Sequence, residues 1–166
     1  MRGGATGVGA AVVRRLFEEG SKIVIGDLNA AGADKLASEL SVTDPGRAIA
    51  CEFNMADEQS INALIQRSVD EFGGIDGLVN MAALVKPEIQ WRDVEVARME
   101  MEIWKMTMDV NLIGFGLATK AALSHMVAQK HGAIVNISSG AAWLGLTFVP
   151  AYASSKAAAY GEYIRK

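Results

Sequence analysis

Short apolar runs alternate with longer stretches of helical periodicity along this chain. The apolar runs predict four strands, at residues 22–26, 48–53, 77–80 and 133–137. Apolar positions that recur every three or four residues predict the helices, at residues 10–19, 30–40, 57–72, 99–125 and 152–166. Strands that alternate with helices form βαβ units, so we predict one α/β domain over residues 1–166. The expected architecture is a Rossmann-like, doubly wound parallel sheet with helices on both faces.

The helix predicted at residues 57–72 has the clearest end signals. Asp57 can cap its first turn, and Gly73 and Gly74 follow its last apolar position. The stretch 99–125 is predicted as one long helix with a broad apolar face. In a parallel sheet of this kind, ligands bind beyond the carboxyl ends of the strands. The residues directly after positions 26, 53, 80 and 137 are therefore the candidate site.

Composition narrows the class of protein without naming a function. The chain has 166 residues, 51% of them apolar and 21% charged, with a net charge of −3. These values are typical of a globular domain, and the mild acidity argues against a nucleic-acid partner. Cys51 is the single cysteine, which excludes an internal disulfide framework and a cysteine-based zinc site. His125 and His131 have no partner at metal-ligand spacing, so we predict no metal.

The segment 132–155 has no charged residue and is long enough to suggest a membrane span. It contains polar residues such as Asn136, Ser138 and Thr147, so a strand followed by an uncharged site loop explains it better. The first residues lack the apolar core of a signal peptide. We therefore expect no membrane association, and the single cysteine fits a reducing, cytoplasmic location.

A glycine-rich segment opens the first predicted helix. It has the spacing Gly3-x-x-x-Gly7-x-Gly9, with Thr6 and Val8 between the glycines. Glycines let a backbone approach a pyrophosphate, and the N-terminus of a helix offers free N–H groups and the positive end of the helix dipole. A tight turn remains the alternative, because glycine is the default residue of turns.

Asp27 and Leu28 stand at the end of the next predicted strand, and Asp27 follows Gly9 by 18 positions. A carboxylate at this place accepts hydrogen bonds from the ribose hydroxyls of a dinucleotide. It would repel a 2′-phosphate, so NAD is favoured over NADP. The alternative is a solvated aspartate in a loop.

Five motifs stand in a defined order along the chain. They are Gly3-x-x-x-Gly7-x-Gly9, Asn80-Met81-Ala82-Ala83, Asn111, Ser139 and Tyr152-x-x-x-Lys156. Together they resemble the short-chain dehydrogenase/reductase superfamily over essentially the whole chain. The resemblance implies an enzyme that exchanges hydride between NAD(H) and a small secondary alcohol or ketone. It also implies a catalytic tetrad of Asn111, Ser139, Tyr152 and Lys156.

The side chains of this tetrad suit the implied chemistry. Tyr152 and Lys156 are four positions apart, so they share one face of a helix. A nearby ammonium favours the phenolate of a tyrosine, which then acts as general base, and in reduction as general acid. The family pattern gives Ser139 the substrate oxygen, Lys156 the nicotinamide ribose and Asn111 a water of a proton relay. A structural Tyr–Lys pair, and an Asn111 that binds neighbouring backbone, are the alternatives.

The resemblance also implies which residues bind the cofactor. They are Gly3, Thr6, Gly7, Val8, Gly9, Asp27, Leu28, Asn54, Met55, Asn80, Ala82, Tyr152 and Lys156. Asn54-Met55 stands where the family has Asp-Val, and Met81 and Ala83 replace Asn and Gly of its Asn-Asn-Ala-Gly motif. The methyl of Ala83 falls where the family backbone runs close to the cofactor.

Measured against this family, the chain lacks the first strand and the C-terminal strands. Because the first strand is central in such a sheet, we expect an incomplete fold with a gap between strands 22–26 and 77–80. We expect the chain alone to fold poorly and to turn over little. Family members form dimers or tetramers, so a homodimer or homotetramer is expected if the fold is complete. The alternative function is a non-catalytic dinucleotide-binding or interaction fragment that has lost its substrate lobe.

Overall fold

The computed structural model describes residues 3–161, and this part of the chain contains four strands. They are β1 (Ile23–Asp27), β2 (Ala48–Glu52), β3 (Gly77–Asn80) and β4 (Ala133–Asn136). All four predicted strands are confirmed, with ends that differ by one residue at most. Asp27 is the last residue of β1, and Asn80 is the last residue of β3. The candidate side chains thus stand at carboxyl ends of strands, as predicted.

The helices follow the predicted order. They are α1 (Gly7–Glu18), α2 (Ala30–Ser41), α3 (Glu58–Phe72), α4 (Pro87–Gln90), α5 (Met101–Met108), α6 (Gly114–Gln129) and α7 (Pro150–Ala158). Short 3-10 turns, η1 and η3, cover Val96–Arg98 and Gly140–Ala142. In α3, the Asp57 carboxylate caps the Gln59 N–H, and Gly73 ends the helix in the left-handed conformation.

Two helix predictions need correction. The expected single helix 99–125 is interrupted by a π-helical segment, η2 (Asp109–Ile113), which separates α5 from α6. The predicted helix 152–166 starts earlier, at Pro150, and its regular part ends at Ala158. Its last predicted residues, 162–166, lie outside the described residues. The short helix α4 was not predicted, because four residues give no periodic signal.

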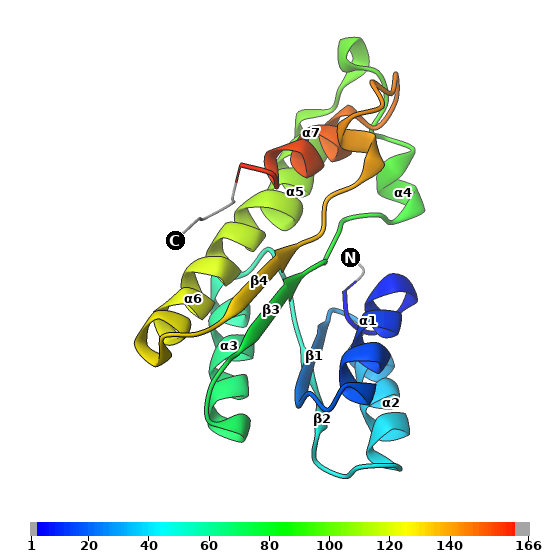
Figure 1. Cartoon of the computed structure of the whole chain (residues 1–166). Helices are drawn as coiled ribbons and strands as arrows, with labels where there is room; N and C mark the ends of the chain where they lie inside the picture. Colours follow the sequence, from blue (N-terminus) through cyan, green and yellow to red (C-terminus); the bar gives the residue numbers. More distant parts are fainter. Residues whose placement is uncertain (1–2, 162–166) are drawn as a thin grey trace.

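The strands form two separate parallel sheets. β1 pairs with β2, β3 pairs with β4, and no ladder joins β1 to β3 among the described residues. Helix α3 connects the two pairs, since it contacts β1 on one side and α6 on the other. Figure 1 shows β1 and β2 lying beside α1 and α2, and β3 and β4 lying beside α6. The predicted gap between the strands at 22–26 and 77–80 is therefore present.

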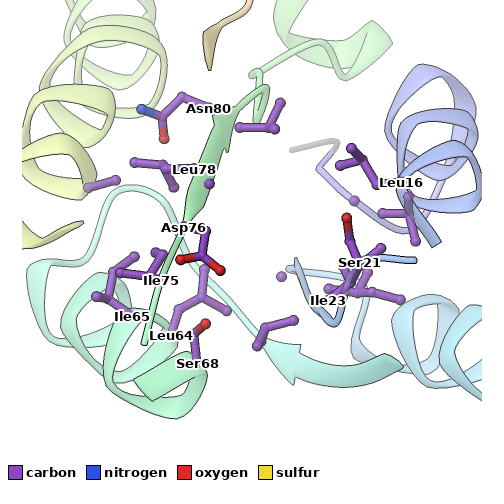
Figure 2. Close-up of a pocket in the computed structure, with 18 of the residues that line it drawn as sticks. Leu16, Ser21, Ile23, Leu64, Ile65, Ser68, Ile75, Asp76, Leu78 and Asn80 are labelled. Atoms are coloured by element: carbon purple, nitrogen blue, oxygen red, sulfur yellow. The ribbon is translucent and has the colours of Figure 1, made fainter. Parts of the chain in front are cut away.

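A cavity of about 920 Å³ occupies this gap. Figure 2 shows its two walls: Leu16 and Ile23 on one side, and Leu64, Ile65 and Leu78 on the other. In a parallel ladder, alternate residues bond to the neighbouring strand. Ile23 N and Asp27 O bond toward β2, and Asp76 O and Asn80 O bond toward β4. The backbone groups of Val24 and Gly26 on β1, and of Gly77 and Val79 on β3, consequently face the cavity.

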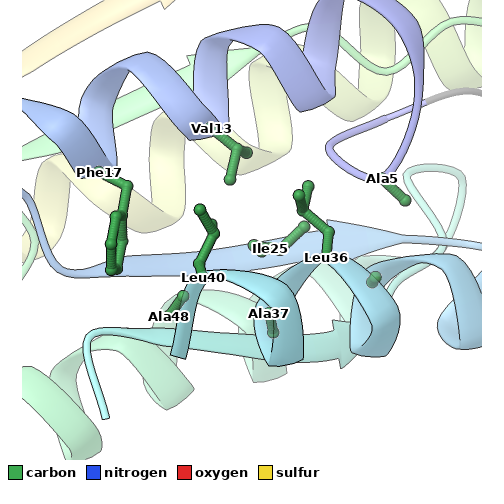
Figure 3. Packing of buried hydrophobic residues seen from close by; sticks show 9 residues of the cluster. Ala5, Val13, Phe17, Ile25, Leu36, Ala37, Leu40 and Ala48 are labelled. Atoms are coloured by element: carbon green, nitrogen blue, oxygen red, sulfur yellow. The ribbon is translucent and has the colours of Figure 1, made fainter. Parts of the chain in front are cut away.

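Buried apolar side chains pack each half separately. In the first half, α1 and α2 cover one face of β1 and β2 through Val13, Phe17, Ile25, Leu36 and Leu40 (Figure 3). In the second half, side chains of α3 and α6 form the core with residues that follow β2 and β3. The other face of β4 is more open, as Val135 is 49% exposed. This division leaves the glycine-rich segment on one half and the segments of Ser139, Tyr152 and Lys156 on the other.

Candidate functional site

The glycine-rich loop folds tightly over the start of α1. Gly7 begins the helix at φ +56°, a left-handed conformation that favours glycine, and its Cβ position faces open space. A Cβ on Gly9 would lie 1.9 Å from the carbonyl oxygen of Gly3, so no side chain fits there. Thr6 and Val8 are exposed beside them. The loop thus presents backbone at a helix N-terminus, the arrangement that receives a phosphate group.

The Asp27 carboxylate holds the glycine-rich loop through hydrogen bonds from backbone N–H groups. One carboxylate oxygen accepts the N–H groups of Gly3 at 2.9 Å and Ala5 at 3.0 Å, and the other accepts Asn29 N–H at 2.9 Å. The side chain is 2% exposed, so the alternative of a solvated loop aspartate is wrong. A carboxylate offers about four acceptor positions, and these bonds use three of them. Leu28, the next residue, is exposed.

Asn80, predicted as a cofactor contact, has a fully buried side chain. Its amide nitrogen donates to Asn136 Oδ1 at 2.9 Å and to Thr119 Oγ1 at 3.2 Å. Its own Oδ1 makes no hydrogen bond within the described residues. The side chain therefore connects β3 to β4 and α6. A ligand at Asn80 would contact the backbone of this residue.

The loop after β3 lies against the glycine-rich loop. A Cβ on Gly9 would come within 3.0 Å of Met81 Sδ, which shows how closely these two segments approach. Ala82 and Ala83 are buried behind Met81. The structure thus brings together two of the motifs that the sequence places about 70 positions apart.

The segment after β2 contains a polar residue, Asn54, and a core residue, Met55. Asn54 Oδ1 accepts the N–H of Ala56, which shapes the turn before α3. Met55 is 3% exposed and lies against Gly114 of α6, where a Cβ would meet Met55 O at 2.2 Å. The Met55 side chain thus packs in the core. The predicted contact of Met55 with a cofactor would be made by its backbone.

Helix α7 carries both Tyr152 and Lys156. Lys156 is 1% exposed, and its ammonium donates to the Ile137 carbonyl at 2.8 Å, just beyond β4. The ammonium also lies 4.8 Å from the ring centroid of Phe115. Burial lowers the pKa of Lys156 to about 8. Ser138 donates to the Lys156 carbonyl at 2.6 Å, which holds the second turn of the helix.

Asn111 lies in the π-helical segment η2 and reaches α7. Its Nδ2 donates to Ser155 Oγ at 3.0 Å, and its Oδ1 accepts the N–H of Leu84 at 2.9 Å. Ser155 in turn donates to the carbonyl oxygen of Tyr152 at 2.7 Å. The Asn111 side chain does bind backbone, but in a distant loop rather than its own helix. Single-turn π segments of this kind are frequent at functional sites.

Ser139 stands directly after β4 and begins the η3 turn. Its Oγ accepts the N–H of Ala141 at 3.2 Å. Ile137, which binds the Lys156 ammonium, is two residues before it. The segments that carry the four predicted residues are thus joined by two bonds, from Asn111 of η2 to Ser155 of α7 and from Lys156 of α7 to Ile137 at the end of β4.

Asp93 is a buried residue of this site that the sequence did not single out. Its carboxylate accepts the N–H of Ala151 at 3.0 Å and of Tyr152 at 2.9 Å, at the first turn of α7. The residue before this helix is Val149, which has no side-chain oxygen with which to cap it. The missing cap was the one sequence signal that a distant side chain must accept hydrogen bonds from the start of α7. It does not indicate which of the acidic residues does so.

The described residues show no metal cluster and no membrane helix. No group of three or more histidine, cysteine or acidic side chains in residues 3–161 is arranged to hold a metal ion. Within the same residues, every helix is too short or too polar to cross a membrane.

A family model described as short chain dehydrogenase matches residues 1–162. The chain belongs to this family. Among curated members of the family, it is 39% identical to the cis-4-hydroxycyclohexanecarboxylate dehydrogenase of Sinomonas cyclohexanicum, over 93% of this chain and 59% of that protein. It is 34% identical to a 3-oxoacyl-acyl-carrier-protein reductase of Synechocystis sp., over 96% of this chain and 62% of the reductase.

A solved family structure agrees with the fold. Sorbitol-6-phosphate 2-dehydrogenase from Erwinia amylovora superposes with a TM-score of 0.86 at 25% identity, covering 95% of this chain and 60% of that one. The predicted Rossmann-like fold and the resemblance are thereby confirmed. The chain spans about 60% of the length of these relatives. The family consists of oxidoreductases that use nicotinamide dinucleotides.

Proposed function

We propose that the chain is the cofactor-binding and catalytic portion of an NAD(H)-dependent oxidoreductase acting on a secondary alcohol or ketone. The observation that carries the proposal is Lys156, a buried ammonium without a carboxylate partner in the described residues, one helical turn beyond Tyr152. Lysine is almost never fully buried without an ion partner, so this arrangement calls for a chemical reason. The relative from Sinomonas is, by its name, a dehydrogenase of a hydroxylated ring.

The glycine-rich loop fits a dinucleotide. Gly7 leaves space above the N-terminus of α1, and Gly9 allows the loop to close on itself. We assign the pyrophosphate to the Gly3–Gly9 backbone, the adenosine ribose to Asp27, and the nicotinamide ribose to Lys156. When bound, NAD supplies the acceptor of the hydride that leaves the substrate carbon.

In the proposed mechanism the proton passes through Tyr152. Its hydroxyl, as the phenolate, takes the proton of the substrate alcohol, and in reduction it returns this proton to the carbonyl oxygen. The positive charge of Lys156 favours the phenolate, because an adjacent cation stabilises the ionised form. Ser139 donates a hydrogen bond to the substrate oxygen and holds it beside Tyr152. Asn111 orients a water of the relay that returns the proton to solvent.

We assign a preference for NAD over NADP to Asp27. Its carboxylate is buried beneath the glycine-rich loop, and three backbone N–H groups hold it there. A 2′-phosphate would bring two negative charges together where water is excluded, and like charges at short distance repel strongly. The ribose 2′-hydroxyl of NAD instead donates to the remaining acceptor position.

We further propose that the complete protein is a cytoplasmic homodimer or homotetramer that associates through α5, α6 and α7. Large apolar side chains are exposed on α5 and η2, among them Met101, Met106 and Ile113. Contact with a second copy would remove such groups from water.

The replacement Tyr152→Phe tests the assigned mechanism. It removes the proton-transferring hydroxyl and leaves the ring, so we expect alcohol oxidation to fall by about 10²-fold or more, the usual contribution of general acid–base catalysis. NADH binding, followed by fluorescence, should stay within about twofold, since the hydroxyl contributes at most one hydrogen bond.

Tyr160→Phe is the matched control, because Tyr160 follows α7 and its hydroxyl accepts a hydrogen bond from Trp143. Its activity should remain close to that of the unmodified protein. Normal turnover by the Tyr152→Phe variant would refute the mechanism. NADH binding by the unmodified chain without oxidation of any secondary alcohol would instead favour a non-catalytic dinucleotide-binding module.

A further inference from the structure

Asp93 holds the first turn of α7 through three hydrogen bonds. Its carboxylate accepts the N–H groups of Ala151 and Tyr152, and its main-chain oxygen accepts the N–H of Val149 at 2.9 Å. The side chain is 5% exposed. The first N–H groups of a helix have no partner inside the helix, and a carboxylate there also meets the positive end of the helix dipole. Asp93 therefore fixes the backbone from which the Tyr152 side chain projects.

The residue that precedes this turn is strained. Val149 has φ +55°, a left-handed conformation that β-branched residues rarely adopt, and Pro150 follows it. Backbone strain of this kind persists where the surrounding structure imposes it. The bond from Val149 N–H to Asp93 O is one of the contacts that impose it. This bond goes to the main chain, so a change of the Asp93 side chain leaves it in place and removes only the acceptor of the Ala151 and Tyr152 N–H groups.

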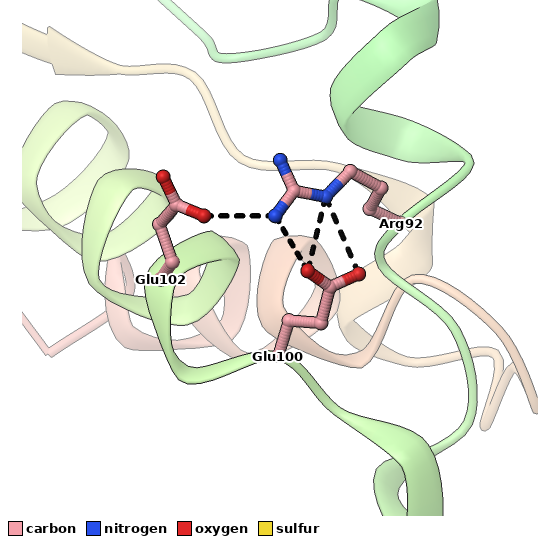
Figure 4. Close-up of polar contacts among 3 residues, drawn as sticks. All are labelled: Arg92, Glu100 and Glu102. Atoms are coloured by element: carbon pink, nitrogen blue, oxygen red, sulfur yellow. Dashed lines mark hydrogen bonds and ion pairs between the residues drawn. The ribbon is translucent and has the colours of Figure 1, made fainter.

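The loop that carries Asp93 is itself anchored to α5. Figure 4 shows the guanidinium of Arg92 between the carboxylates of Glu100 and Glu102, with 2.8 Å to Glu102 Oε2. These groups are exposed, and surface ion pairs of this kind contribute little to stability on their own. They attach the segment directly before Asp93 to the start of α5. The short segment Arg92–Asp93 thus links α5 to α7.

The two turns of α7 are held by different residues. Asp93 holds the first turn at Tyr152, whereas Ser138 holds the second turn through the Lys156 carbonyl, and the Lys156 ammonium bonds to Ile137. A change at Asp93 should therefore displace Tyr152 and leave Lys156 in place. This separation makes the role of Asp93 measurable apart from general stability.

We propose that Asp93 is a positioning residue for Tyr152, which it sets at the reacting oxygen through the backbone of the first turn of α7. This inference rests on the proposed function, in which Tyr152 is the general acid–base. It adds that Asp93 determines where Tyr152 lies. Misplacement of a reacting group by about 1 Å can cost on the order of 10²-fold in rate. The loss is expected in kcat, with cofactor affinity preserved.

The variants Asp93→Ala and Asp93→Asn test this role in the full chain. Alanine removes both acceptors, so kcat should fall by about tenfold or more, with KM and NADH affinity changed by less than about threefold. Asparagine keeps one acceptor of the same shape and should recover part of that loss. Asp57→Ala is the matched control, since Asp57 caps α3 in the same way but far along the chain from α7.

Two structural readouts accompany the kinetics. Amide exchange at Ala151 and Tyr152 should accelerate at least tenfold in Asp93→Ala, since their acceptor is gone. The 13Cζ resonance of Tyr152, assigned with Tyr152→Phe, should shift, while the Lys156 ammonium should keep its pKa near 8. If Asp93→Ala does not fold, the same kinetics and resonances are measured for Asp93→Asn and for Arg92→Gln. The Arg92→Gln variant leaves the Asp93 carboxylate intact.

The outcomes separate the two proposals. Normal turnover by Tyr152→Phe refutes the proposed function whatever Asp93 does. An inactive Tyr152→Phe together with an Asp93→Ala variant of normal kcat and unchanged Tyr152 resonance overturns the positioning role alone. An equal loss of kcat in Asp57→Ala also overturns it, because the effect is then one of stability. Where the unmodified chain shows no turnover, an unmoved Tyr152 resonance in Asp93→Ala is decisive against the role.

Discussion

The Lys156 ammonium lies in the interior of the protein with a carbonyl and an aromatic ring as its partners. Water would solvate this charge better, so folding lowers the pKa of Lys156 from an ordinary 10.5 to about 8. At neutral pH the group is still mostly protonated and carries the positive charge that the proposed mechanism uses. The position is therefore unfavourable for stability, and pKa values perturbed in this way cluster at functional sites.

The lowered pKa of Lys156 predicts a pH-dependent stability. Between about pH 8 and 10.5 the unfolded chain holds a proton at Lys156 that the folded chain has released. Because the unfolded state then binds more protons, this residue makes the free energy of unfolding rise with pH, by at most about 1.4 kcal/mol per pH unit. Urea unfolding at pH 7.5 to 10 should reveal the rise as a gain in the stability of the unmodified protein relative to Lys156→Met.

The exposed Lys105→Met controls for the loss of one positive charge from the protein surface. A stability difference between the unmodified protein and Lys156→Met that stays constant over this pH range would contradict the assigned shift.

The sequence predicts Tyr152 and Lys156 as site residues, because their motif stands in order with the four others that carry the family resemblance. Asp93 was not found, since its bond to Tyr152 spans 59 positions of the chain.

At the scale of elements, apolar runs located all four strands, and periodicity located the longer helices. Short apolar runs mark strands that are buried in a sheet, so the signal is contained in four or five consecutive residues. The interruption of the long helix at η2 was missed, because Asn111 bonds to residues of α7 and of the loop after β3. The side-chain spacing of that stretch still looks helical, and only its partners reveal the change.

The edges of β1 and β3 that face the cavity predict a pattern of hydrogen exchange. The amide of Ile25 bonds to β2 and should be protected, whereas that of Val24 faces the cavity and should exchange at least tenfold faster. On β3, Leu78 should be protected and Val79 should exchange faster, for the same reason. Residue-resolved exchange by NMR measures both pairs. Equal protection of Val24 and Ile25 would show that the cavity is closed in solution.

At the scale of the whole molecule, the candidate site is divided between the two halves. The glycine-rich loop and Asp27 belong to the half built on β1 and β2, whereas Tyr152 and Lys156 belong to the half that contains β4. Helix α3 and the loop after β3 are the links that hold these halves in register. A dinucleotide assigned to both sets of residues would therefore add a further link between the halves.

We predict that NAD raises the melting temperature more than NADP does. A ligand at 100 times its Kd stabilises the folded state by about 2.7 kcal/mol, which for a chain of this size is roughly 5–10 °C. The shift with NADP should be smaller, because the Asp27 carboxylate, which we assign to the adenosine ribose, would repel the 2′-phosphate. A thermal-shift titration of the unmodified chain with both cofactors measures this. An equal or larger shift with NADP would contradict the assigned preference.

The sequence by itself determined the order of strands and helices, the glycine-rich start, and the family that Ser139, Tyr152 and Lys156 resemble. Each of these depends on residues close together in the chain, where spacing dictates which side chains share a face. Tertiary structure decided that Asp27 lies beneath the glycine-rich loop, that Asn80 and Met55 serve the interior, and that Asp93 caps α7. Those roles depend on which distant backbone groups need a partner, and only the packing of the folded chain brings such groups within hydrogen-bond distance.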